Sequence, residues 1–188
     1  AFLIGPTGSG KTTLLRLAYM DLFPNVGRVI VNKYDSSKIK HKKIPYFRRK
    51  IGMVFQDYHL LSDRNLFDNI ALPLHVMGFK KDEIIDRVEE SLEEIGLESK
   101  SNHYPNELSG GEQQRACVAR ALIKEPDIIL ADEPTGNLDP VTSFELIKLL
   151  EEINREGTSI LMASHNYNLI KGRGHRIIEI QNGTVRKS

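Results

Sequence analysis

The fold is decided by residues 1–13, which read AFLIGPTGSGKTT. The apolar residues 1–4 are typical of a buried strand, and we predict a helix from Thr12 to Leu22. Between them, residues 5–12 match G-x-x-x-x-G-K-[ST] in the strand–loop–helix context that this motif requires. Glycines let successive backbone N–H groups point inward, and the helix N-terminus adds unpaired donors. The stretch therefore predicts a phosphate-binding loop.

The residue types in this loop suggest individual roles. We predict that Lys11 bridges the β- and γ-phosphates of a nucleotide and that the Thr12 hydroxyl contacts Mg²⁺. The structural alternative is a glycine-rich turn without a ligand. The other predicted nucleotide-binding residues are Gly5, Pro6, Thr7, Gly8, Ser9, Gly10 and Thr13.

Two adjacent acids follow a second apolar run, residues 128–131. In open α/β sheets, the carboxyl ends of the strands face the ligand crevice, and an unpaired buried carboxylate is costly. We therefore predict that Asp132 reaches Mg²⁺, directly or through water, and that Glu133 holds and polarises the attacking water. The structural alternative is a solvated turn before Pro134.

A second anion-binding turn is predicted at Ser109-Gly110-Gly111. Ser109 is a good N-cap, and Glu112, three residues later, completes a capping box. The glycine pair exposes backbone N–H groups at a positive helix end. A single nucleotide needs only one phosphate loop, so this second turn serves something else. One answer is a nucleotide held on another subunit.

Apolar strands alternate with amphipathic helices along most of the chain. This alternation predicts an α/β fold with a mainly parallel sheet. The further predicted strands are residues 28–32, 51–56, 128–131 and 158–163, with a hairpin of 176–180 and 183–186 turned at Asn182-Gly183. The further predicted helices are 112–123, 143–155 and 81–95, the last with Asp82 as N-cap and Gly96 as its stop.

Length and composition fit one globular domain. The 188 residues are 40% hydrophobic and 27% charged. We expect a core of residues 1–57 and 108–188, with residues 58–107 as a helical insertion. Because the first strand has no residues before its apolar run, we also expect N-terminal strands of the sheet to be missing.

Charge and cysteine content exclude several classes. There are 26 Lys and Arg against 25 Asp and Glu, so the chain is not a globally basic nucleic-acid binder. Cys117 is the only cysteine, which excludes an internal disulfide, and we interpret it as a core residue. No apolar run approaches the roughly 18 to 20 residues that span a bilayer.

Residues 108–115, LSGGEQQR, resemble the signature motif of ABC-type ATPases. The phosphate loop and the paired acids stand at the expected distances before and after it, and the resemblance covers essentially the whole chain. It implies the P-loop NTPase fold of that family with a helical subdomain. It also implies ATP contacts in trans by Leu108, Ser109, Gly110, Gly111, Glu112 and Gln113, and a D-loop of Asn137, Leu138 and Asp139.

Two single residues gain a role from this resemblance. Gln56 resembles the glutamine of the family's Q-loop, and His165 resembles the switch histidine. The resemblance implies catalytic roles beside Glu133: Gln56 senses Mg²⁺ or the water, and His165 donates to the γ-phosphate. A lone Gln or His is more often structural. Asn166 departs from the family, where Asp is frequent at this position.

The resemblance implies an ATP-hydrolysing subunit that forms a homodimer in the ATP state, with ATP and Mg²⁺ bound. Residues 48–57 and 58–64 are most similar to the family's cell-division branch. That branch implies an integral membrane partner through which the chain contacts the membrane, a peripheral location on the cytoplasmic face of the inner membrane, and activation of cell-wall hydrolases. The alternative within the family is the ATPase of a lipoprotein-releasing or macrolide exporter. In the family, the aromatic residue that stacks on adenine lies in the N-terminal part that we expect to precede these residues.

Other classes fit less well. A DNA-maintenance ATPase head carries a long coiled coil between its two motifs, whereas residues 13–107 show no sustained heptads, so we expect no nucleic-acid partner. A monomeric P-loop kinase leaves residues 109–111 unexplained. We interpret the basic run 38–50 as a solvated surface. The alternative is that it contacts anionic lipid headgroups or an acidic loop of a partner protein. Residues 58–67 are core packing, or they form the groove that the resemblance implies for a coupling helix.

Overall fold

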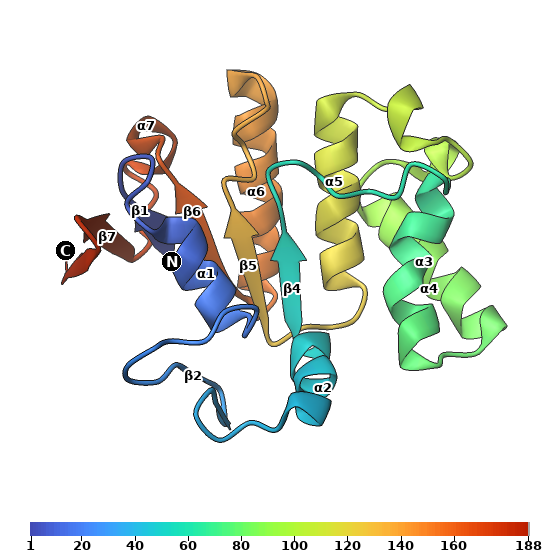
Figure 1. The fold of residues 1–188 in the computed structure, drawn as a ribbon. Helices are drawn as coiled ribbons and strands as arrows, with labels where there is room; N and C mark the ends of the chain where they lie inside the picture. Colours follow the sequence, from blue (N-terminus) through green and yellow to red (C-terminus); the bar gives the residue numbers. More distant parts are fainter. Residues whose placement is uncertain (188) are drawn as a thin grey trace.

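The computed structural model describes residues 1–187 and contains a six-stranded sheet in the order β4-β5-β6-β1-β7-β8 (Figure 1). All neighbours are parallel except β7 and β8, which form the predicted hairpin with positive φ at Asn182 and Gly183. The α/β prediction is therefore confirmed. The strands are β1 (Phe2–Ile4), β4 (Ile51–Val54), β5 (Ile128–Asp132), β6 (Ser159–Ser164), β7 (Ile177–Gln181) and β8 (Thr184–Lys187).

Helices cover both faces of this sheet. Because side chains alternate along a strand, Ile129 and Ala131 of β5 join the core formed with α5 and α6, whereas Leu130 joins the core on the opposite face with Leu15 of α1. The helices are α1 (Lys11–Ala18), α2 (Ile44–Arg49), α3 (Leu66–Met77), α4 (Lys81–Glu94), α5 (Gly110–Leu122), α6 (Pro140–Arg155) and α7 (Tyr167–Ile170). Short 3₁₀ turns are η1 (His41–Lys43), η2 (Glu98–Lys100) and η3 (Pro105–Glu107).

A third core joins α3, α4 and α5 at the side of the molecule next to β4 (Figure 1). Ile70 of α3, Val88 of α4 and Ala119 of α5 are fully or almost fully buried in it. The insertion is therefore largely helical, as predicted. Its separation from the rest as a subdomain of residues 58–107 stays a prediction, because α5 packs against both parts.

Two predicted elements differ from the structure near the N-terminus. The first helix ends at Ala18 rather than Leu22, because Met20 adopts a left-handed φ of 54° with its side chain buried. The predicted strand 28–32 shrinks to β2 (Ile30–Val31), which pairs only with β3 (Tyr34–Asp35) in a separate two-stranded sheet. Both outcomes depend on tertiary packing that local propensity does not describe.

One predicted N-cap is wrong, and one helix was not predicted. The N-cap of α4 is Lys80, not Asp82, because the Lys80 backbone is extended and its N–H donates to the Glu83 carboxylate at 3.1 Å. Asp82 instead lies in the first turn, where a negative charge favours the helix dipole. Helix α2 falls within the basic run and was not predicted. The predicted stop of α4 at Gly96 is confirmed by its φ of 64°.

Candidate functional site

The predicted phosphate loop connects β1 to α1 and needs glycine at several positions. Gly8 and Gly10 have φ values of 78° and 101°. A Cβ at Gly5 would lie 2.4 Å from the Ile180 carbonyl oxygen, so a larger residue would push two backbones apart. Gly10 is the N-cap of α1 and supplies no capping side chain. The first N–H groups of α1 therefore remain unpaired by a cap, as an anion site requires.

An open pocket of about 420 Å³ adjoins this loop at the carboxyl edge of the sheet. It brings together the loop and three residues that the sequence placed far apart, Gln56, Glu133 and His165. Pro6, Gly5 and Ser9 are predicted ATP-binding residues that do not line it, and the Ser9 hydroxyl is buried beneath the loop. The lining residues are Thr7, Gly8, Gly10, Lys11, Thr12, Thr13, Gln56, Glu133 and His165.

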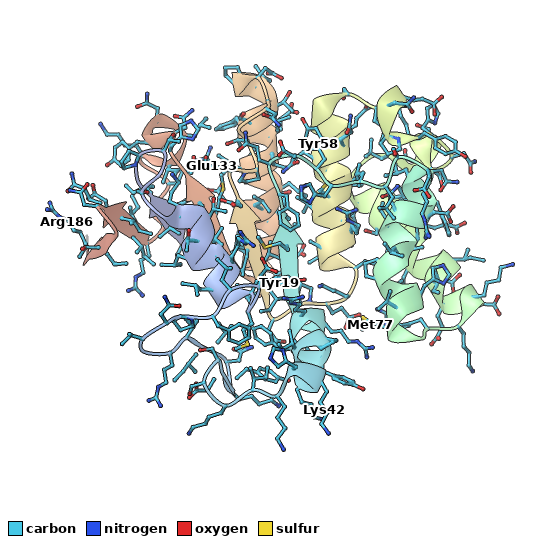
Figure 2. The ribbon with its side chains drawn as sticks, in the orientation of Figure 1. Tyr19, Lys42, Tyr58, Met77, Glu133 and Arg186 are labelled. Carbon is cyan, nitrogen blue, oxygen red and sulfur yellow. The ribbon has the colours of Figure 1, made fainter. Side chains whose placement is uncertain are left out.

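Lys11 and His165 hold the Glu133 carboxylate from two sides. The Lys11 ammonium lies 3.2 Å from Glu133 Oε1, and His165 Nδ1 lies 2.9 Å from Oε2. The His165 backbone N–H also donates to Oε2 at 3.2 Å. Lys11 donates further to the carbonyls of Gly5 and Pro6, at 2.8 and 3.2 Å. Figure 2 labels Glu133 above the tip of β5.

The backbone at Glu133, whose side chain lines the pocket, is strained. Its φ is 47°, in the left-handed region that non-glycine residues rarely adopt. The conformation is fixed by two backbone hydrogen bonds, from Glu133 N–H to the Ala163 carbonyl at 3.1 Å and from Gly136 N–H to the Glu133 carbonyl at 2.9 Å. Strain of this kind concentrates at functional sites.

Asp132 is a predicted site residue that does not line the pocket, but it contacts Thr12, which does. The Thr12 hydroxyl donates to Asp132 Oδ1 at 3.2 Å, and burial raises the pKa of the Asp132 carboxyl above its usual value. No group of three or more His, Cys, Asp or Glu side chains suited to a metal occurs within residues 1–187. Mg²⁺ nevertheless prefers oxygen ligands and often binds them together with phosphates. Such oxygens are offered by the hydroxyl of Thr12, the carboxylate of Asp132 and the side-chain amide of Gln56.

Gln56 is tied to the predicted D-loop. Its amide Nε2–H donates to Asn137 Oδ1 at 3.2 Å, and Asn137 Nδ2–H donates to the Gln56 carbonyl at 3.1 Å. Asp139 caps α6 by accepting from the N–H groups of Val141 and Thr142, and the Thr142 hydroxyl bond is the main cause of the lowered pKa of Asp139. Asn137, Leu138 and Asp139 do not line the pocket.

The signature turn forms the predicted capping box at the start of α5. Glu112 accepts from the Ser109 N–H at 2.8 Å, and the Ser109 hydroxyl accepts from the Glu112 N–H at 3.3 Å. Lys100 adds an ion pair to Glu112 at 2.9 Å, and chiefly through that contact the pKa of Glu112 falls to about 2. Gln113 donates to the carbonyl of Leu108 at 3.1 Å.

This turn lies on the same side of the molecule as the phosphate loop but away from the pocket (Figure 1). Ser109 is exposed, whereas Leu108 is buried. A Cβ at Gly111 would lie 2.5 Å from Thr142 Cγ2, so α6 supports the turn from behind. The structure thus does not bring the signature residues to the pocket beside the phosphate loop of their own chain.

Sequence reasoning missed one group of residues, on the inner face of α5. Arg120 donates to the carbonyls of His59 and Tyr58 at 2.7 and 3.0 Å, and the Cys117 thiol donates to the Tyr58 carbonyl at 2.8 Å. Cys117 is buried as predicted, and burial raises its pKa to about 12. The signal in the sequence was the three-residue spacing of Gln114, Cys117 and Arg120, which places a glutamine and an arginine on the face of α5 that carries the cysteine.

Within residues 1–187, no helix has the length and apolar character needed to cross a membrane.

Comparisons with known proteins place the chain in one family. The family model described as ABC transporter matches residues 1–136. The cell division ATP-binding protein FtsE of Bacillus subtilis is 45% identical over 184 residues, which are 98% of this chain and 81% of that protein. FtsE of Mycobacterium tuberculosis is 47% identical over 98% of this chain and 80% of its own length.

Solved structures agree with this family. The dimeric post-hydrolysis state of the ATP-binding cassette MJ0796, bound to ADP and Pi, has a TM-score of 0.87 and 35% identity, and the match covers 99% of this chain and 84% of that one. CbiO1 of Clostridium perfringens, part of the transporter complex cbiONQ, has a TM-score of 0.88 and 30% identity over 98% of this chain and 74% of its own.

Proposed function

The chain belongs to the ABC transporter family and is an ATPase, and from this premise we propose that it is one half of an ATP-bridged homodimer that drives a membrane protein in cell division. The observation that carries the proposal is the arrangement of Glu133 between Lys11 and His165, in a pocket that lacks the signature turn of its own chain.

The pocket residues have separate roles in this proposal. The phosphates of ATP take the place of Glu133 as the partner of Lys11, while the loop N–H groups bind the remaining phosphate oxygens. Glu133 is then available to orient a water molecule and to accept its proton. His165 lies beside the same carboxylate and donates to the γ-phosphate or keeps Glu133 in position.

We further propose that Mg²⁺ accompanies the nucleotide, held by Thr12, Asp132 and Gln56. When bound, it neutralises charge on the phosphate oxygens. Asp132 is well suited, because it is partly buried, and its carboxylate already accepts a hydrogen bond from the Thr12 hydroxyl. Gln56 links this position to the D-loop through Asn137.

The dimer follows from the unused anion site at the signature turn. Ser109 is exposed, and the turn lies on the side of the molecule that also carries the phosphate loop (Figure 1). Gly110 and Gly111 begin α5, where backbone N–H groups have no partner within the helix. In a head-to-tail pair, Lys11 of one chain and Ser109 of the other would clamp each ATP. The dimeric MJ0796 structures support the formation of a dimer.

The biological role rests on the relatives named cell division ATP-binding protein FtsE. We propose an integral membrane partner of the FtsX type, a peripheral position on the cytoplasmic face of the inner membrane reached through that partner, and activation of cell-wall hydrolases as the output. Purification from detergent-solubilised membranes tests the role. Recovery of an FtsX-like subunit supports it, and recovery of a lipoprotein-releasing or macrolide exporter subunit would replace it.

Glu133→Gln tests the enzymatic part of the proposal. Loss of the base should lower steady-state ATP hydrolysis by about a hundredfold or more, while ATP affinity stays within about twofold. Glu93→Gln, which alters an exposed carboxylate on α4, is the matched control and should keep full activity. Hydrolysis by Glu133→Gln at the parent rate would contradict the proposal.

A further inference from the structure

Tyr58 contacts α5 at two places that are far apart along the helix. We propose that Tyr58, anchored by Arg120, is a positioning residue that makes the Gln56 segment and the signature turn move as one unit. This inference rests on the proposed function, because it concerns the signature turn as the site that completes the pocket of the opposite chain.

The backbone of Tyr58 is held in an unusual conformation. Tyr58 and His59 both have left-handed φ values, 58° and 51°, which is costly for two consecutive non-glycine residues. Their carbonyls therefore turn toward α5, where Arg120 donates to both and the Cys117 thiol donates to that of Tyr58. A partly buried guanidinium with two carbonyl partners is a strong anchor.

The side chain of Tyr58 reaches the other end of the same helix. A Cβ at Gly110 would lie 2.8 Å from Tyr58 Oη and 3.8 Å from Cζ, so the ring tip touches the first turn of α5. Ten residues separate Gly110 from Arg120, a rise of about 15 Å. Together, Tyr58 and its anchor Arg120 thus connect the last turn of α5 to the signature turn, and Figure 2 labels Tyr58 beside the upper half of α5.

A third contact fixes the start of the segment. Gln114 Nε2–H donates to the Phe55 carbonyl at 3.3 Å, and Gln114 is fully buried. Gln114, Cys117 and Arg120 are spaced by three residues and so share one face of α5. Gln56 lies between the carbonyls that they bind and lines the nucleotide pocket. A displacement of Gln56 is therefore transmitted to the signature turn without an intervening flexible hinge.

The test uses the Glu133→Gln chain, in which ATP is bound but not turned over. Tyr58→Ala should leave ATP affinity, measured by calorimetry, within about twofold, because Tyr58 does not line the pocket. The same change should raise the dissociation constant of the ATP-bound dimer about tenfold in sedimentation velocity, as expected for a lost aromatic contact. Arg120→Lys, which cannot donate in fork geometry to both carbonyls, should act in the same direction.

Leu60→Ala is the matched control. Leu60 packs against the core that Tyr58 contacts and also against the core of α3, α4 and α5, but it does not touch Gly110. Leu60→Ala should therefore lower the melting temperature, as Tyr58→Ala does, and leave dimerisation unchanged. Equal effects of Tyr58→Ala and Leu60→Ala on dimerisation, or none from Tyr58→Ala, would overturn this inference alone. Failure of the Glu133→Gln parent to dimerise would overturn the proposed function and this inference together.

Discussion

Replacing Glu112 by Gln tests how the signature turn is held in place. Glu112 accepts from the Ser109 backbone and pairs with Lys100, and its pKa is about 2 instead of 4.5. A shift of that size corresponds to about 3 kcal/mol in a fully desolvated site. The Lys100 side chain is 35% exposed, so water screens its ion pair with Glu112. We therefore expect Glu112→Gln to lower the free energy of unfolding by only about 1 kcal/mol.

The pH dependence gives the sign of this contribution. Since folding lowers the pKa of Glu112, its stabilisation is fully present above pH 4.5 and is lost as the pH falls toward 2. Urea unfolding at pH 7 should therefore show Glu112→Gln less stable by about 1 kcal/mol, a fall of about 2 to 4 °C in melting temperature. At pH 3, the free energies of unfolding of Glu112→Gln and the parent should lie closer together.

Glu98→Gln is the control for this prediction. Glu98 is an exposed acid of η2 with no ion pair among residues 1–187, so its replacement should change stability by less than about 0.5 kcal/mol. A Glu112→Gln chain as stable as the parent at pH 7, or a difference that widens in acid, would refute the reasoning.

Two further substitutions and one labelling experiment test other parts of the structure. Lys11→Ala should weaken ATP binding about a hundredfold in calorimetry, and an unchanged affinity would remove Lys11 from its proposed role. Gly5→Ala should lower the free energy of unfolding by about 2 kcal/mol or more, because its Cβ meets the Ile180 carbonyl; a stability equal to that of the parent would show that the loop can move away. Cys117 should not react with a thiol reagent at pH 8 until urea unfolds the chain, since burial raises its pKa to about 12; rapid labelling of the folded protein would show that this part of α5 opens.

The features that could be predicted from the sequence are local ones. The phosphate loop, the Ser109–Glu112 capping box and the strand before Asp132 each depend on residues close together in the chain, and the structure forms all three. The parallel sheet followed from the alternation of apolar strands and amphipathic helices.

The features that could not be predicted depend on distant contacts. Glu133 pairs with Lys11, at the start of α1, and with His165, which follows β6. Two hydrogen bonds join Gln56 to Asn137, 81 residues away. The end of α1 at Met20 required a buried side chain in a left-handed conformation, which no local pattern indicates.

Light scattering of the Glu133→Gln chain with ATP tests the central claim most directly. The claim is that two chains enclose the nucleotide, so saturating ATP should give twice the 21.3 kDa mass of the single chain, and ADP should not. A mass of 21.3 kDa at saturating ATP, with binding confirmed by calorimetry, would contradict it.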